Sequence, residues 1–208
     1  MSHLAIGEVS ETLRHALWLG LRADLVTRQL ITSEQNIVLA NPGQVTLPQG
    51  VVRQLSLWLY QVLPNEHLRN QPLVRRSTGG PPPNDDLQFQ PPLSLNLFYL
   101  LTPSIQDAGG ASDQLADQRV LGRVMQVLHD QSILAMPNRQ APAAAHELHV
   151  SLAPRTIDEI AQVWEAMQQP YRLSVCYEVR AVQIDSERRR AGGRVEERRT
   201  DFARVEEA

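Results

Sequence analysis

The sequence predicts an α/β (α+β) domain, in which a mixed or mostly antiparallel sheet of about four to six strands packs against about three helices. Two observations carry this prediction. Three stretches have the residue pattern of a β-strand, or of a strand followed by a polar turn. They are Leu55–Asn70, Pro91–Thr102 and Tyr171–Asp185. The intervening segments carry apolar residues at helical spacing. With 208 residues, of which 42% are apolar, the chain suits one domain, or one domain with an extension.

The N-terminal segment is expected to form an amphipathic helix of about five or six turns, because apolar residues recur every four positions. These residues are Val9, Leu13, Leu17, Leu21 and Leu25. Turns are expected at Asn41-Pro42-Gly43 and at Pro48, with a short strand at Ile37–Leu39.

Leu55–Val62 is the first strong strand, and it is apolar on both faces. Leu55, Leu57 and Leu59 share one face, and Trp58, Tyr60 and Val62 share the other. This pattern indicates a central strand that is covered on both sides, either by helices or by a neighbouring subunit. Beyond Pro64 the chain becomes polar.

The segment Leu73–Gln90 contains Gly79-Gly80 and three successive prolines from Pro81. We expect an exposed, mobile loop, or a segment that becomes ordered only on a partner. The second strand follows, with one face formed by Leu93, Leu95, Leu97, Tyr99 and Leu101. Pro103 is expected to end it, since proline cannot donate to a strand ladder.

A second helix is expected from Ser112 or Asp113 to about Asp130, and Leu148–Leu152 alternates like a short strand. Thr156 and Glu159 have the spacing of a capping box, so a third helix is expected there, ending before Pro170. Its apolar face is predicted to contain Ile157, Ile160, Trp164 and Met167.

The last strand is predicted to be long, roughly 40 Å, with strict alternation of its side chains. The inward residues are Leu173, Val175, Tyr177, Val179 and Ala181. Residues 1–185 are therefore expected to form the domain, with 73–90 as its mobile loop. Residues 186–208 form an extension rich in Arg and Glu that is expected to be disordered or loosely helical.

All 20 basic residues are Arg, which suits protein–protein contacts, although genome composition gives the same bias. The net charge of −3 gives no reason to expect nucleic acid as the main partner. The Arg cluster Arg188–Arg190 could contact phosphates, but interleaved acids favour pairing with charged protein surfaces or a solvated tail.

Cys176 is the single cysteine, so neither an intrachain disulfide nor a cysteine-based zinc site is expected. We expect neither a signal peptide nor a membrane span, and therefore a cytoplasmic protein. No phosphate-binding glycine loop or metal-ligand spacing is recognised, so no cofactor and no metal is expected. A hydrolase using His67 or His149 remains an alternative.

The motif blocks together resemble the tail-terminator (cap) family of contractile injection systems, of the Photorhabdus virulence cassette and antifeeding prophage type. The resemblance rests on the blocks IGEVSETLRHAL, LWLYQVLPNEHLRN, PPLSLNLFYLLT and QQPYRLSVCYEVRAVQID. It covers about Leu4–Asp185 and leaves out the Arg-rich end.

The resemblance implies a structural phage-tail-like subunit without enzymatic activity. It implies a ring, commonly a hexamer, on the baseplate-distal end of the tube and sheath, which stops polymerisation and fixes length. The implied partners are the chain itself, the inner tube protein and the sheath protein, in a particle that stays in the cell or is released. Another adaptor or connector of the same particle is the alternative.

By match to the motif blocks, the resemblance also implies candidate interface residues in three sets. They are Tyr60, Asn65, Arg69 and Asn70; Pro91, Pro92, Tyr99 and Thr102; and Arg172, Tyr177, Glu178 and Arg180. Each has a local alternative. Tyr99 and Tyr177 fit a core, the asparagines fit turns, and Pro91-Pro92 fits the approach to a strand.

Overall fold

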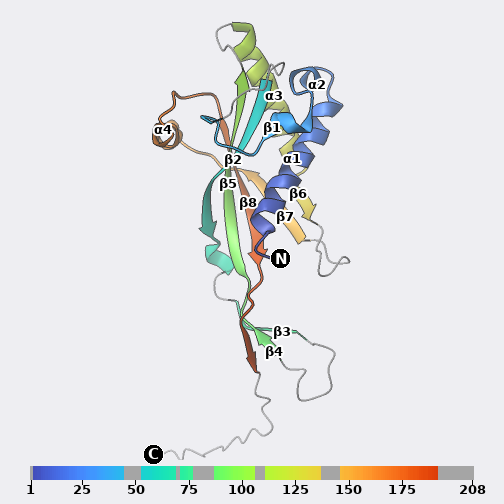
Figure 1. Cartoon of the computed structure of the whole chain (residues 1–208), viewed down its shortest axis with the longest axis vertical. Coiled ribbons are helices and arrows are strands. Elements are labelled where there is room, and N and C mark those ends of the chain that lie inside the picture. The colour runs from blue at the N-terminus through green and yellow to red at the C-terminus, as the bar shows by residue number, and fades with distance from the viewer. Residues whose placement is uncertain are drawn as a thin grey trace, which may run out of the picture. The chain divides into compact units, whose positions relative to one another are not determined.

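A six-stranded sheet with the strand order β1-β2-β5-β8-β7-β6 organises the larger of two units in this chain (Figure 1). The computed structural model describes residues 2–44, 53–68, 71–76, 87–105, 111–136 and 146–191. The larger unit comprises Met1–Arg69 and Leu93–Asp185, and the smaller one comprises Asn70–Pro92 and Ser186–Ala208.

The sheet of the larger unit is mostly antiparallel, as predicted. Its strands are β1 (Ile37–Val38), β2 (Arg53–Pro64), β5 (Leu93–Ile105), β6 (Ile133–Met136), β7 (His146–Leu152) and β8 (Val175–Ile184). The short β1 pairs in parallel with β2, and the other neighbours pair antiparallel. The predicted fold class is therefore confirmed.

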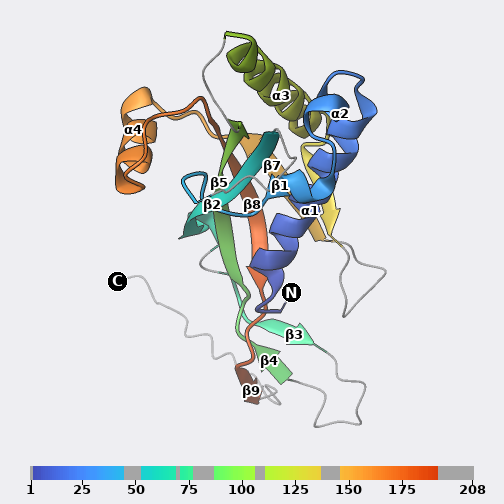
Figure 2. The same ribbon diagram turned by 45° about the horizontal axis from the view of Figure 1, so that its top comes forward.

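Helices cover both faces of this sheet (Figures 1 and 2). They are α1 (Ala5–Ala23), α2 (Thr27–Leu30), α3 (Ala111–Asp130) and α4 (Ile157–Ala166), with the 3₁₀ turns η1 (Glu34–Asn36) and η2 (Glu66–Leu68). The helices α1 and α3 lie on one face, and α4 lies on the other (Figures 1 and 2).

The main core lies between the sheet and the pair α1 and α3. The predicted stripe of α1 is confirmed at Val9, Leu13, Leu17 and Leu21, which are all buried. Leu25 was wrongly placed in that stripe, because the helix ends at Ala23 and Leu25 is 66% exposed. The chain turns away at Asp24, whose Oδ2 accepts hydrogen bonds from the backbone N–H groups of Val26 and Thr27.

The helices α1 and α3 approach each other closely at Gly20. A Cβ atom added to this glycine would overlap the side chain of Val127 on α3. The Arg123 guanidinium, also on α3, donates hydrogen bonds to the carbonyl of Gly20 from Nε at 3.2 Å and from Nη2 at 3.1 Å. A small residue in α1 therefore sets the distance between the two helices.

A smaller apolar cluster lies on the opposite face, under α4. Trp164 of α4 packs with Leu100 of β5 and Cys176 of β8, and all three are buried. The predicted capping box is present: Thr156 Oγ1 accepts from the Glu159 N–H, and the Glu159 carboxylate accepts from the Thr156 N–H. Ile157 does not join the buried face, since it is 68% exposed.

Several expectations about strand ends and faces were wrong. The strand β5 continues through Pro103, which pairs with Leu55 of β2. Pairing between β5 and β8 ends at Leu101, so this proline lies where β5 has a free side. The strand β6 was not expected, because four residues are too short to show a clear alternation.

Bulges caused the remaining errors. Leu59 pairs with Tyr99 but Gln61 pairs with Phe98, so β2 carries Tyr60 as an extra residue, and Val62 moves to the face of Leu57. In β8 the bulge residue is Ala181, with φ 65°, and Val182 takes the inward position expected for it. The last strand also begins at Val175, after the exposed Leu173, and has ten residues.

The smaller unit contains a three-stranded antiparallel sheet in the order β3-β4-β9. Its strands are β3 (Val74–Arg76), β4 (Leu87–Phe89) and β9 (Arg189–Ala191). The prediction of a loop throughout 73–90 was therefore wrong at β3 and β4, and Arg189–Ala191 is a strand rather than coil or helix. The sequence also predicts a loop at Pro137–Ala145, which lies outside the described residues.

Candidate interaction surface

Among the described residues, the outer side of β2 pairs with another strand at only two positions. The strand β1 pairs only with Leu55 and Ser56, and no other described strand joins β2 on that side. Beyond this pairing, residues Leu57–Pro64 have the sequence LWLYQVLP and carry no charge, whereas the charged Arg53 lies at the other end of the strand and is buried. Soluble proteins usually protect such edges with charged side chains. This edge is limited only by the bulge at Tyr60 and by Pro64, so it can accept an added strand.

Apolar side chains are exposed at the end of the same strand. Val62 is 40% exposed and Leu63 is 41% exposed, and they point to opposite faces because they are neighbours in a strand. Leu93, at the start of β5, is also exposed. An incoming strand would therefore meet apolar contacts on both faces as well as free backbone groups.

A chain of polar side chains crosses three neighbouring strands close to this end of β2. Asn65 Nδ2 donates to Asn96 Oδ1 at 2.9 Å, and Asn96 Nδ2 donates to Glu178 Oε1 at 2.9 Å. Glu178 Oε2 accepts from Arg180 through Nε at 2.8 Å and Nη2 at 2.7 Å. The sheet thus joins three predicted candidates, Asn65, Glu178 and Arg180, through Asn96. We call this set of four residues the polar ladder.

The two ends of the polar ladder differ in exposure. Asn65 is buried, and its Oδ1 caps η2 by accepting from the N–H groups of His67 and Leu68. Arg180 is 57% exposed, although its guanidinium is held by Glu178. A charge-assisted, two-donor contact fixes the direction of the side chain. Arg180 is therefore the exposed member of the ladder, with its direction fixed by Glu178, and Asn65 is its buried member.

Tyr60 belongs to an aromatic group on the α4 face. Its ring centroid lies 6.2 Å from that of Trp58 and 6.4 Å from that of Phe98. The Arg155 guanidinium lies 5.3 Å from the centroid of Phe98. Burial, the largest cause, raises the pKa of Tyr60 to about 12, so its hydroxyl stays protonated. Sequence reasoning missed Arg155 and Asn96, whose only signals were ordinary positions beside a capping box and within a strand.

The other candidate interface residues predicted from the sequence do not lie together in the structure. Tyr99, Thr102 and Tyr177 are buried in the core, and the Tyr99 hydroxyl lies 2.8 Å from Ser10 Oγ. Pro91 and Pro92 are half-buried and precede β5. Arg172 is exposed and lines a pocket of about 370 Å³. Arg69 and Asn70 lie outside the described residues.

Two features of the described residues bear on catalysis. No group of three or more His, Cys, Asp or Glu side chains among them could hold a metal ion. The Cys176 thiol is buried, and burial raises its pKa, which disfavours the reactive thiolate.

None of the helices in the described part of the chain combines the length and apolar character needed to cross a membrane.

The fold and the open edge define a mixed α/β subunit that is suited to association through its strands. Residues 8–197 match the family described as the Pvc16 N-terminal domain, and the chain belongs to this family. The match extends past Asp185, where the resemblance was expected to end.

Two solved structures share the fold. One is a sheath/tube terminator of the PVC extracellular contractile injection system in its extended state, with a TM-score of 0.56 and 15% identity, covering 99% of this chain and 64% of that one. The other is the tube-terminating cap of the anti-feeding prophage, with a TM-score of 0.52 and 16% identity, covering 90% of this chain and 59% of that one. The chain thus spans about three fifths of each relative. No curated protein sequence matches it.

Proposed function

We propose that this chain is the tail terminator, or cap, of a contractile injection system. It forms a ring on the baseplate-distal end of the tube and sheath, stops their polymerisation and sets the particle's length. The observation that carries the proposal is the fold, which a PVC sheath/tube terminator shares over 99% of this chain. Membership of the Pvc16 N-terminal domain family supports it.

The open edge of β2 supplies a physical means of capping. A tube built from identical rings grows through contacts that do not close on themselves, so it needs a subunit that ends the series. A cap must bind the last ring on one face without offering a new copy of that face on the other. An uncharged strand edge suits the first task, because backbone hydrogen bonds supply affinity and side chains select the partner.

The partners we propose are other copies of this chain, in a homo-oligomeric ring that is a hexamer, together with the tube protein and the sheath protein. Nucleic acid and membrane insertion have no part in the proposal. Assembly takes place in the cytoplasm. The domain of residues 1–185 makes the ring, and the Arg- and Glu-rich residues 186–208 act as an arm on charged protein surfaces.

The proposed role is structural rather than catalytic. The two solved relatives are a terminator and a cap. The buried Cys176, with its raised pKa, is a core residue in this proposal rather than a nucleophile.

Deletion of the gene, followed by electron microscopy of the particles, tests the proposal. We expect tubes of uncontrolled length or few intact particles, and recovery when the wild-type chain is supplied. Particles of normal length and number would contradict a capping role. A gold label on the chain at the baseplate-proximal end would indicate an adaptor or connector instead.

A further inference from the structure

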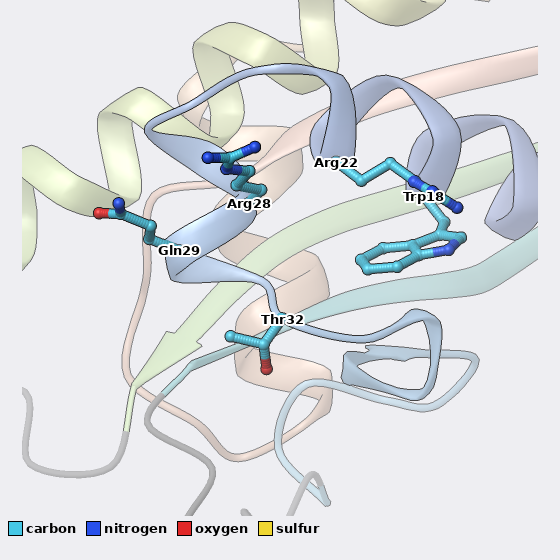
Figure 3. A pocket seen from close by; sticks show the side chains of 5 residues that line it. All are labelled: Trp18, Arg22, Arg28, Gln29 and Thr32. Atoms are coloured by element: carbon cyan, nitrogen blue, oxygen red, sulfur yellow. The ribbon is translucent and has the colours of Figure 1, made fainter.

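A shallow hollow at the corner between α1 and α2 is not used by the polar ladder or the open strand edge. It is lined by Trp18, Arg22, Arg28, Gln29 and Thr32 (Figure 3). The guanidinium carbon of Arg22 lies 5.8 Å from the centroid of the Trp18 ring. A cation over an aromatic face is held in place while its outer edge stays free to bind an anion. Tryptophan and arginine are also the residues that most often anchor protein interfaces.

The hollow keeps an excess of positive charge. Within the described part of the chain, neither Arg22 nor Arg28 forms an ion pair with a carboxylate. Asp24, the acid between them in sequence, is engaged by the N–H groups of Val26 and Thr27 and by the Thr27 hydroxyl. Arg123, which is bound to the Gly20 carbonyl, adds another cation near Asp24.

Exposed apolar residues are neighbours of the lining residues in the sequence. Leu25 is 66% exposed, and Leu19 and Val26 are about half exposed. The combination of two unpaired arginines with exposed leucine and valine predicts a partner surface that has acids beside an apolar side chain.

The helix α4 of the same chain carries acidic residues beside an exposed apolar side chain. Ile157 is the most exposed of the large apolar side chains in the described residues, and Asp158 follows it directly. Glu165 is exposed seven residues later, so the two acids share one helix face about 10 Å apart along the axis. Glu159 is already paired with Arg155, but Asp158 and Glu165 have no described ion pair.

We propose that the hollow between α1 and α2 binds the acidic face of α4 from a second copy of this chain. The two surfaces lie on opposite faces of the sheet (Figures 1 and 2). A contact between them is therefore head-to-tail, and after it forms one copy keeps a free α4 and the other copy keeps a free hollow. Such a contact repeats until a ring closes. The inference rests on the proposed ring of the cap and assigns a contact within it.

Reciprocal charge reversal in the full-length chain tests this contact. We expect Arg22→Glu with Arg28→Glu to raise the apparent dissociation constant of self-association at least tenfold, measured by analytical ultracentrifugation. Asp158→Arg with Glu165→Arg is expected to do the same. All four substitutions together restore opposite charges, so the constant is expected to return to within about threefold of the wild-type value.

A mixture of the two double variants is expected to recover association, although each variant alone does not associate. The intact α4 of one variant binds the intact hollow of the other, and the two reversed surfaces, an acidic hollow and a basic α4, also attract each other. Arg119→Glu and Glu147→Arg make the same kinds of charge change at exposed positions outside both surfaces, and they are expected to leave association unchanged. Circular dichroism of every variant checks that the fold is retained.

A wild-type chain that stays monomeric at about 100 μM would overturn the contact. Folded double variants that associate like the wild type, or a folded fourfold variant that fails to recover, would also overturn it. If the charge-reversal test fails but gene deletion gives particles of abnormal length, the capping role is retained and only this contact is excluded. If the charge-reversal test succeeds but deletion leaves particle length normal, the contact between copies is retained and the capping role is excluded.

Discussion

At the scale of single residues, both the oxygen and the nitrogen of the Asn65 side-chain amide form hydrogen bonds. The oxygen caps η2, and the nitrogen begins the polar ladder by donating to Asn96. The residue is buried at the point where β2 ends, so no water replaces these bonds without moving the corner. Asn65 thereby links the end of β2 to the orientation of Arg180, two strands away.

We predict that Asn65→Ala lowers the free energy of unfolding by about 1–2 kcal/mol, since it removes both the cap and the bond to Asn96. Asn65→Ser keeps an oxygen that can cap η2 but loses the bond to Asn96, and should therefore be affected less. Urea unfolding of the two variants measures both losses. Equal stability of wild type and Asn65→Ala would show that the amide contributes nothing net.

At the scale of elements, the approach of α1 to α3 depends on the absence of a side chain at Gly20. Gly7 lies on the same helix, but an added Cβ there would meet open space. The two glycines differ in packing alone, so they form a matched pair for measuring the cost of overfilling this contact.

We predict that Gly20→Ala destabilises the fold by about 1–2 kcal/mol, because the clash with Val127 exceeds the gain in helix propensity. Gly7→Ala should instead stabilise it by up to about 1 kcal/mol. Adding Val127→Ala to Gly20→Ala should cost less than the sum of the two single changes. Additive losses in thermal unfolding would mean that the two side chains do not compete for space.

The capping box of α4 makes the helix sensitive to acid. The backbone N–H of Thr156, the largest cause, lowers the pKa of Glu159 below its usual value of 4.5. A carboxyl group whose folded pKa lies below its unfolded value stabilises the fold above the unfolded pKa. That contribution is lost as pH falls through the folded pKa.

We therefore predict that the urea midpoint of the wild type falls between pH 5 and pH 3 more steeply than that of Glu159→Gln, which keeps an acceptor but does not titrate in this range. At pH 7 the wild type should be the more stable of the two. Parallel pH profiles would show that this carboxylate has no role in the acid response.

At the scale of the whole molecule, the proposed capping activity depends on the uncharged edge of β2. Val62→Lys with Leu63→Lys places two charges on exposed positions of that edge, so the subunit should still fold while its strand pairing is blocked. We predict abnormal particle lengths like those of the deletion strain, with unchanged circular dichroism. Leu115→Lys, at an exposed position of α3, is the control and should give normal particles. Normal lengths with both edge lysines would exclude this edge from capping.

Local sequence patterns were sufficient to predict an element where residues close in sequence make the interactions that form it. The stripe of α1, the capping box of α4 and the alternation along β5 and β7 predicted those elements, because their spacing alone selects the backbone. The bulges at Tyr60 and Ala181 were not predictable in this way. Each arises from a mismatch with a partner strand that is distant in sequence.

The candidate residues show the same division. The motif blocks named Asn65, Glu178 and Arg180 separately, but the antiparallel register of β2, β5 and β8 and the unnamed Asn96 join them. Amino-acid order thus established the three longer helices, the longer strands and the family resemblance, because these depend on short-range spacing. Chain folding established the polar ladder, the open edge of β2 and the opposite positions of the α1–α2 hollow and α4. These features depend on which distant segments pair and which sides stay unpaired, and no local pattern encodes that.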